Sequence, residues 1–180
     1  METLNISENA EANKLLNNVV SGLKAFTDKM VGHIKRLTDI GTALSLEGQT
    51  SKLMEMIVDE ARTFTNADGG TLYIKTDDGK HLAFEIVQND SLNTRMGGTS
   101  GKITWPEVGL FNKNGEGNHT NVSAHVALTG VTINIPDVYE AEGFDFSGTK
   151  EFDKKTKYRS KSMLVVPLKD NENEVIGVIQ

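Results

Sequence analysis

Apolar positions in the first quarter of the chain recur at steps of three and four. They are Leu16, Val19, Leu23, Phe26, Met30, Leu37, Ile40 and Leu44, with His33 taking one position of the series. A seam of about four heptads is typical of a coiled coil. It predicts a long helix over residues 14–46 that pairs in a homodimer and carries a signal. The alternative is a helix that packs on its own domain.

A second amphipathic helix follows a break in the pattern at residues 46–49. Thr50 or Ser51 can cap this helix, and Asp68-Gly69-Gly70 comes directly after it. Its apolar positions are Leu53, Ile57, Ala61 and Phe64. They repeat with helical spacing and predict one buried face.

The rest of the chain alternates strand and turn signals. Residues 71–75 and 81–88 flank a turn with Asp78-Gly79, which predicts a hairpin with Leu82, Phe84 and Ile86 on one face. A second hairpin is predicted from strands 163–168 and 175–179. Between the hairpins the pattern predicts loops over residues 89–119 around an apolar piece at 103–111, a helix over 122–128 capped by Asn121 and closed by Gly130, and a strand over 131–135. The expected fold class is α+β, with a central antiparallel sheet, flanking helices and the long amino-terminal helix in front.

Composition narrows the functional classes. The chain has 180 residues, 37 % of them hydrophobic and 24 % charged, which fits one globular domain with an appendage. A net charge of −6 argues against a nucleic-acid-binding surface. The amino end shows no signal-peptide pattern, and no apolar run reaches the roughly 18 residues of a membrane span, so we expect a cytoplasmic protein without membrane contact.

Residues that carry chemistry are sparse. The absence of cysteine excludes disulfides, thiol nucleophiles, cysteine-ligated metals and a Cys-linked chromophore. No nucleophile and base motif appears, so the sequence predicts no enzyme. His119 and His125 are six residues apart, which does not place them on one helix face, and no carboxylate or thiol clusters with them. The sequence therefore predicts no metal site, and His125 alone is weak evidence for a haem ligand.

Four stretches in order resemble a GAF domain over residues 50–180. They read ADGGTLYI, AHVALTGVTINIPDVY, FDKKTKYRSKSMLVVPLKD and NEVIGVIQ. The likeness is greatest to the cyclic-nucleotide-binding GAF domains of phosphodiesterases and adenylyl cyclases, and similar architecture occurs in bacterial HD-GYP and sensor proteins. The resemblance implies a flexible tail over 1–13, a signalling helix over 14–47 and a GAF domain over 48–180. Because the family's closing motif and helix would follow Gln180, we expect a fragment of a longer protein with an output domain.

The resemblance also implies a ligand site without a covalent cofactor, for which cyclic GMP or cyclic AMP is the candidate ligand. Backbone N–H groups at the start of the helix would bind a phosphate of the ligand. An acidic residue and hydroxyl groups in the segment before the penultimate strand would also contact the ligand. Further residues would line the nucleotide base and close the site. The matching positions are Val122 and Ser123, then Asp153, Thr156 and Ser160, then Val87 and Gln88 under the base, and Gln180. On composition alone, Asp153, Thr156 and Ser160 are typical of an exposed polar loop, and that interpretation is favoured without the resemblance.

Two functions remain in view. The first is a regulatory sensory module in which a small ligand binds between the sheet and a lid formed by residues 112–128 and 144–161. The second is a degenerate GAF domain that binds nothing and serves as a dimerisation spacer. The GAF-type methionine sulfoxide reductases need cysteines, so that activity is not expected for this chain.

Overall fold

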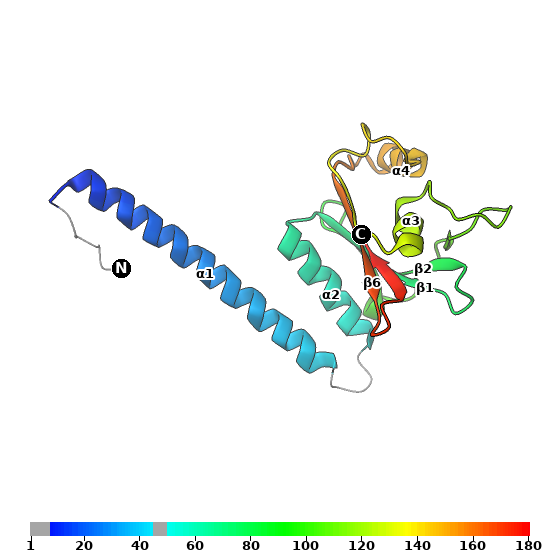
Figure 1. Cartoon of the computed structure of the whole chain (residues 1–180), viewed down its shortest axis with the longest axis horizontal. Coiled ribbons are helices and arrows are strands. Elements are labelled where there is room, and N and C mark those ends of the chain that lie inside the picture. The colour runs from blue at the N-terminus through cyan, green and yellow to red at the C-terminus, as the bar shows by residue number, and fades with distance from the viewer. Residues whose placement is uncertain (1–7, 45–49) are drawn as a thin grey trace. The chain divides into compact units, whose positions relative to one another are not determined.

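The computed structural model describes residues 8–44 and 50–180 (Figure 1). The chain divides between Glu47 and Gly48 into two compact units, each of which is described by itself. No helix in the described ranges is both long and apolar enough to cross a membrane.

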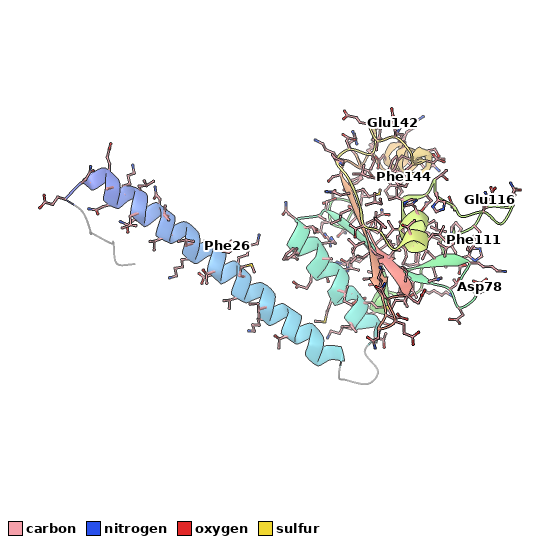
Figure 2. The ribbon with its side chains drawn as sticks, viewed as in Figure 1. Phe26, Asp78, Phe111, Glu116, Glu142 and Phe144 are labelled. Atoms are coloured by element: carbon pink, nitrogen blue, oxygen red, sulfur yellow. The ribbon has the colours of Figure 1, made fainter. Side chains whose placement is uncertain are left out.

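The first unit is the helix α1 (Ala10–Leu44), which confirms the predicted long helix. Asn9 caps it, because its Oδ1 accepts hydrogen bonds from the backbone N–H groups of Glu11 and Ala12. Apolar side chains of the predicted seam are exposed: Leu23 is 60 % and Phe26 63 % exposed, and Figure 2 shows Phe26 standing out from the helix. The side chains of His33, Leu37, Ile40 and Leu44 lie outside the described residues.

The second unit is built on one antiparallel sheet, in which the described strands follow the order β3-β2-β1-β7-β6-β5 and β4 pairs with β2. The strands are β1 (Gly69–Lys75), β2 (His81–Asn89), β3 (Thr94–Gly97), β4 (Val108–Gly109), β5 (Ile133–Ile135), β6 (Met163–Lys169) and β7 (Val175–Ile179). Both predicted hairpins are confirmed, as β1–β2 and β6–β7. The stretch predicted as loops contains β3, β4 and a 3₁₀ turn at Gly98–Ser100.

Helices cover the two faces of the sheet separately (Figure 1). Helix α2 (Thr50–Thr65) packs Val58 against Leu72 and Ile86 on one face. Helix α3 (Val122–Thr129) covers the other face, and Phe146, directly before helix α4 (Ser147–Thr156), packs into the same core. The core on this second face contains Tyr73, Leu82, Leu110, Val122, Val126, Val138, Phe146, Val165 and Val178.

A bulge in β2 changes the predicted face of that strand. Tyr73 pairs with Phe84 but its neighbour Leu72 pairs with Ile86, so that one residue of β2, Glu85, has no partner in β1. An extra residue reverses the side-chain alternation beyond it. Leu82 and Phe84 therefore lie with the α3 core, whereas Ile86 lies with the α2 core, and the prediction of one shared face was wrong for Ile86.

The buried face of α2 also differs from the prediction. Leu53, Val58 and Arg62 are buried, whereas Phe64 is 68 % exposed. The guanidinium of Arg62 donates to Gln88 Oε1 at 3.1 Å and to the backbone oxygen of Asp68 at 2.9 Å, and it forms an ion pair with Asp90. These hydrogen bonds and the ion pair offset the cost of burying the charge of Arg62. Arg62 therefore lies on the buried face of α2, although a hydrophobic pattern would place an arginine on the surface.

Candidate ligand site

Helix α3 begins and ends where the sequence predicts. Asn121 Oδ1 accepts a hydrogen bond from Ala124 N at 3.0 Å, and Gly130 ends the helix with a φ of 65°. The left-handed conformation at Gly130 suits glycine, which has no Cβ to clash. The N–H groups of a first helical turn have no partners within the helix, so the turn that contains Val122 and Ser123 is suited to an anion.

Three polar side chains meet under this turn, among apolar neighbours. Ser123 Oγ donates to Gln180 Oε1 at 2.9 Å, and the Ser123 side chain also hydrogen-bonds with the Tyr73 hydroxyl. The backbone of Gln180 exchanges two 2.8 Å hydrogen bonds with Thr71, which fixes its position at the edge of β1. Burial raises the pKa of Tyr73 to about 12, so the phenol is neutral. We call Ser123, Gln180 and Tyr73 the polar triad.

The structure thus joins two residues that the resemblance assigned separately, Ser123 and Gln180, and adds Tyr73. Sequence reasoning did not single out Tyr73 as a site residue, although a buried tyrosine usually finds a partner for its hydroxyl. The sequence offered one signal for such a role, because Tyr73 carries a hydroxyl group and stands between the apolar residues Leu72 and Ile74 in a predicted strand.

The segment after β5 contains a helix that the sequence did not predict. Helix α4 carries charged side chains outward, with Lys154 and Lys155 exposed, and it ends at Lys157, whose φ is 59°. The large buried apolar side chain of Phe146 lies directly before α4, and α4 itself lacks a hydrophobic repeat. These lysines face solvent.

Asp153 is buried in this segment, at 2 % exposure, and is held by nearby donors. Its Oδ2 accepts from Ser160 N at 2.8 Å and from the Tyr139 hydroxyl at 3.1 Å, while its Oδ1 accepts from Ser160 Oγ at 2.8 Å. Asp153 and Ser160, two of the predicted ligand contacts, therefore bind each other. Thr156 Oγ1 donates to the backbone oxygen of Phe152 within α4.

Two further contacts tie down the end of this segment. Arg159 donates to both carboxylate oxygens of Asp137, at 2.9 and 3.0 Å, and stacks over the Tyr139 ring at 3.7 Å from its centre. The Tyr158 hydroxyl donates to Asp68 Oδ2 at 2.7 Å. This hydrogen bond is the main cause that lowers the pKa of Asp68. These contacts hold residues 158 and 159 against neighbouring segments. From here on the name lid refers to residues 144–161 alone.

The base-lining positions do not lie together. Gln88 points to the face of the sheet that α2 covers, where its side-chain oxygen accepts a hydrogen bond from Arg62. The structure therefore does not bring Gln88 to the polar triad. Val87 is buried, and strand alternation places it on the opposite face from Gln88. Trp105, the lone tryptophan, sets its ring edge-on to Phe84 at 5.3 Å and is 41 % exposed.

Packed side chains occupy the space between α3 and the sheet. Val122, Ala124, Val126 and Ala127 of α3 are buried against the sheet core. A cavity of about 200 Å³ lies between α2 and the β2–β3 edge, and one of about 290 Å³ lies at the far end of α3. Neither of these two cavities is lined by Ser123, Asp153 or Gln180.

Two solved structures resemble this chain over 82 % of its length. The GAF domain of a phosphoenolpyruvate-protein phosphotransferase from Coxiella burnetii matches with a TM-score of 0.52 and 13 % identity, covering 82 % of this chain and 74 % of that one. A free methionine-R-sulfoxide reductase from Neisseria meningitidis matches with a TM-score of 0.52 and 14 % identity, covering 82 % and 70 %. At these identities the likeness shows the fold alone, and one of the two neighbours is an enzyme.

Sequence comparisons give the family. The dual 3',5'-cyclic-AMP and -GMP phosphodiesterase 11 of Drosophila melanogaster is 44 % identical over 61 residues, which are 34 % of this chain and 4 % of that protein. The phosphodiesterase 11A of Takifugu rubripes is 41 % identical over 59 residues, which are 33 % of this chain and 6 % of that protein. The chain therefore spans a small part of these relatives. The model of the GAF domain family matches residues 49–180, and this chain belongs to that family.

Proposed function

We propose that this GAF domain is a regulatory sensory module that binds a small anionic or purine-like ligand, with cyclic GMP and cyclic AMP as the first candidates. The observation that carries the proposal is the polar triad at the amino end of α3. Buried polar groups are costly, and here they converge on a helix end that attracts anions. The similarity to dual-specificity cyclic nucleotide phosphodiesterases supports a nucleotide as the ligand.

Binding in this proposal requires the lid to exchange partners. In the structure, Ser160 and Tyr139 donate hydrogen bonds to the Asp153 carboxylate. Tyr158 hydrogen-bonds with Asp68, and Arg159 hydrogen-bonds with Asp137. A ligand that replaces some of these contacts biases the lid between two states. Coupling of this kind is commonly about 1–3 kcal/mol. Helix α1 then transmits the difference to an output domain as part of a homodimer.

The second candidate function is the dimerisation spacer without a ligand. It is favoured by the packed core between α3 and the sheet and by the three donors that already satisfy Asp153. In that case α1 pairs the chains and the lid stays closed under all conditions.

A thermal unfolding screen separates the two functions. The chain is heated with cyclic AMP, cyclic GMP and cyclic dinucleotides, since a ligand at 100 times its Kd stabilises the folded state by about 2.7 kcal/mol. The sensory module predicts a higher midpoint with at least one nucleotide. It also predicts that the shift shrinks in Ser123→Ala but persists in Thr63→Ala, whose hydroxyl bonds within α2. A midpoint that no nucleotide moves contradicts the sensory proposal and leaves the spacer.

A further inference from the structure

The side chains of His119 and His125 contact each other near the start of α3. His125 lies in α3, and His119 lies in the loop before it. Asn118 folds that loop, because its Oδ1 accepts from Thr120 Oγ1 and from Asn121 N. The result places His119 Nδ1 3.1 Å from His125 Nδ1, with the ring planes at 74°.

The separation of the two Nδ1 atoms matches a chelating pair. Zinc binds imidazole nitrogen at about 2.0–2.1 Å, so two such ligands lie about 2.9 Å apart at a right angle and about 3.3 Å apart at the tetrahedral angle. The observed 3.1 Å falls between these values. The spacing of the two nitrogens therefore allows one metal ion to contact both once each ring turns its Nδ1 toward it.

Both rings are held from other sides. The His125 ring meets Phe144 edge-on at 5.4 Å, and Figure 2 shows Phe144 beside α3. Gly117 leaves room for His119, because a Cβ there would come within 2.8 Å of His119 Nε2. His119 is exposed, so solvent can reach the pair and supply the remaining ligands. A prearranged pair loses less entropy on binding than two free side chains.

We propose that His119 and His125 bind one divalent transition-metal cation of the zinc class through their Nδ1 atoms, with water in the remaining positions. Neutral imidazole is a common ligand for zinc, copper and nickel. The sequence predicted no metal site, because two histidines six residues apart do not lie on one face of a helix. Only His125 belongs to helix α3, whereas His119 lies in the loop before it, so this spacing does not keep the two rings apart. The site does not involve the polar triad, so it stands or falls independently of nucleotide binding.

Calorimetric titration of the whole chain, free of any affinity tag, with zinc chloride tests the site. The expected result is binding of one Zn²⁺ per chain, with at least tenfold weaker affinity in His119→Gln and in His125→Gln. His81→Gln is the matched control, because His81 lies in the β1–β2 hairpin region near Asp78 and Glu107, and its variant should bind like the wild type. Circular dichroism checks that each variant is folded.

Nitrogen-15 NMR of the imidazole rings adds a readout that does not depend on the variants. Zinc should shift the Nδ1 resonances of His119 and His125 together and leave His81 unchanged. Three results would overturn the proposal: no zinc binding by the wild type up to about 1 mM; undiminished affinity in His119→Gln; or a resonance pattern of a simple N–H···N hydrogen bond that zinc does not alter.

Discussion

Ser123 and Asp153 are both buried, but their hydrogen bonds do different work. Asp153 binds Ser160 and Tyr139, which belong to the lid and to the segment leading into it. Ser123 joins helix α3 to the ends of β1 and β7 through Tyr73 and Gln180. Asp153 therefore links residues within and next to the lid, whereas Ser123 links helix α3 to the sheet. In the proposed function, a ligand would contact this part of the sheet.

Removing the Ser123 hydroxyl tests the polar triad. Ser123→Ala removes the donor to the partly buried side-chain oxygen of Gln180, and an unsatisfied group costs about 1–3 kcal/mol when it is fully buried, which sets the upper limit here. Urea unfolding should show a loss of up to that size. Thr63→Ala, on the exposed side of α2, should change the free energy of unfolding by less than about 0.5 kcal/mol. Equal small losses in both variants would show that the triad contributes nothing to stability.

The Tyr158–Asp68 hydrogen bond gives the lid a dependence on pH. The bond lowers the pKa of Asp68, so its stabilisation is present above the ordinary carboxyl pKa, about 3.9, and is lost as the pH falls through the lower folded-state value. Tyr158→Phe should raise the pKa of Asp68 toward the ordinary value in a carboxyl-carbon NMR titration. Its unfolding free energy should approach that of the wild type as the solution becomes acidic. An unchanged Asp68 titration would mean that the tyrosine does not hold the lid.

At the scale of elements, local signals were sufficient where they were strong. The Asn121 cap and Gly130 end α3 where expected, and turn residues fix both hairpins. Helix α4 was missed because its sequence is mostly charged and lacks a repeated apolar stripe. The bulge opposite Leu72 and the inward turn of Arg62 depend on contacts between distant segments, which a local pattern does not contain.

The close approach of β7 to β1 makes Gly177 a sensitive position. A Cβ at Gly177 would lie 2.5 Å from the backbone oxygen of Tyr73, so Gly177→Ala must push the strands apart. Overpacking typically costs about 1–3 kcal/mol. Gly148→Ala in α4 is the control, because its Cβ would meet nothing within 4 Å. A Gly177→Ala variant as stable as Gly148→Ala in urea would contradict the packing of these strands.

For the whole molecule, the resemblance predicted the GAF family and its α+β fold, and the family match and the solved structures confirm both. It placed Ser123, Gln180, Asp153 and Ser160 in one site, whereas the hydrogen bonds of the structure join Ser123 to Gln180 and Asp153 to Ser160 as two pairs. It did not foresee that Gln88 faces α2, since one bulge decides on which face β2 presents its side chains. Tyr73 and Tyr139 were missed because their roles depend on partners far away in the sequence.

Dimer formation through α1 is a prediction about the whole chain. Leu23 and Met30 lie on the exposed seam, and charges there would oppose a coiled-coil contact. The double variant Leu23→Glu/Met30→Glu should sediment as a monomer. Ser21→Glu/Ala25→Glu adds the same charge away from the seam and should remain a dimer. A monomeric wild type, or a seam variant that stays dimeric, would contradict the role given to α1.

The central claim is that a ligand binds beside the polar triad, and calorimetric titration with cyclic GMP and cyclic AMP tests it most directly. We predict saturable heat with one nucleotide per chain for at least one of them, at an affinity of about micromolar, which corresponds to about −8.2 kcal/mol. Ser123→Ala should weaken that binding. No saturable heat from either nucleotide, with the chain folded throughout, would contradict the account.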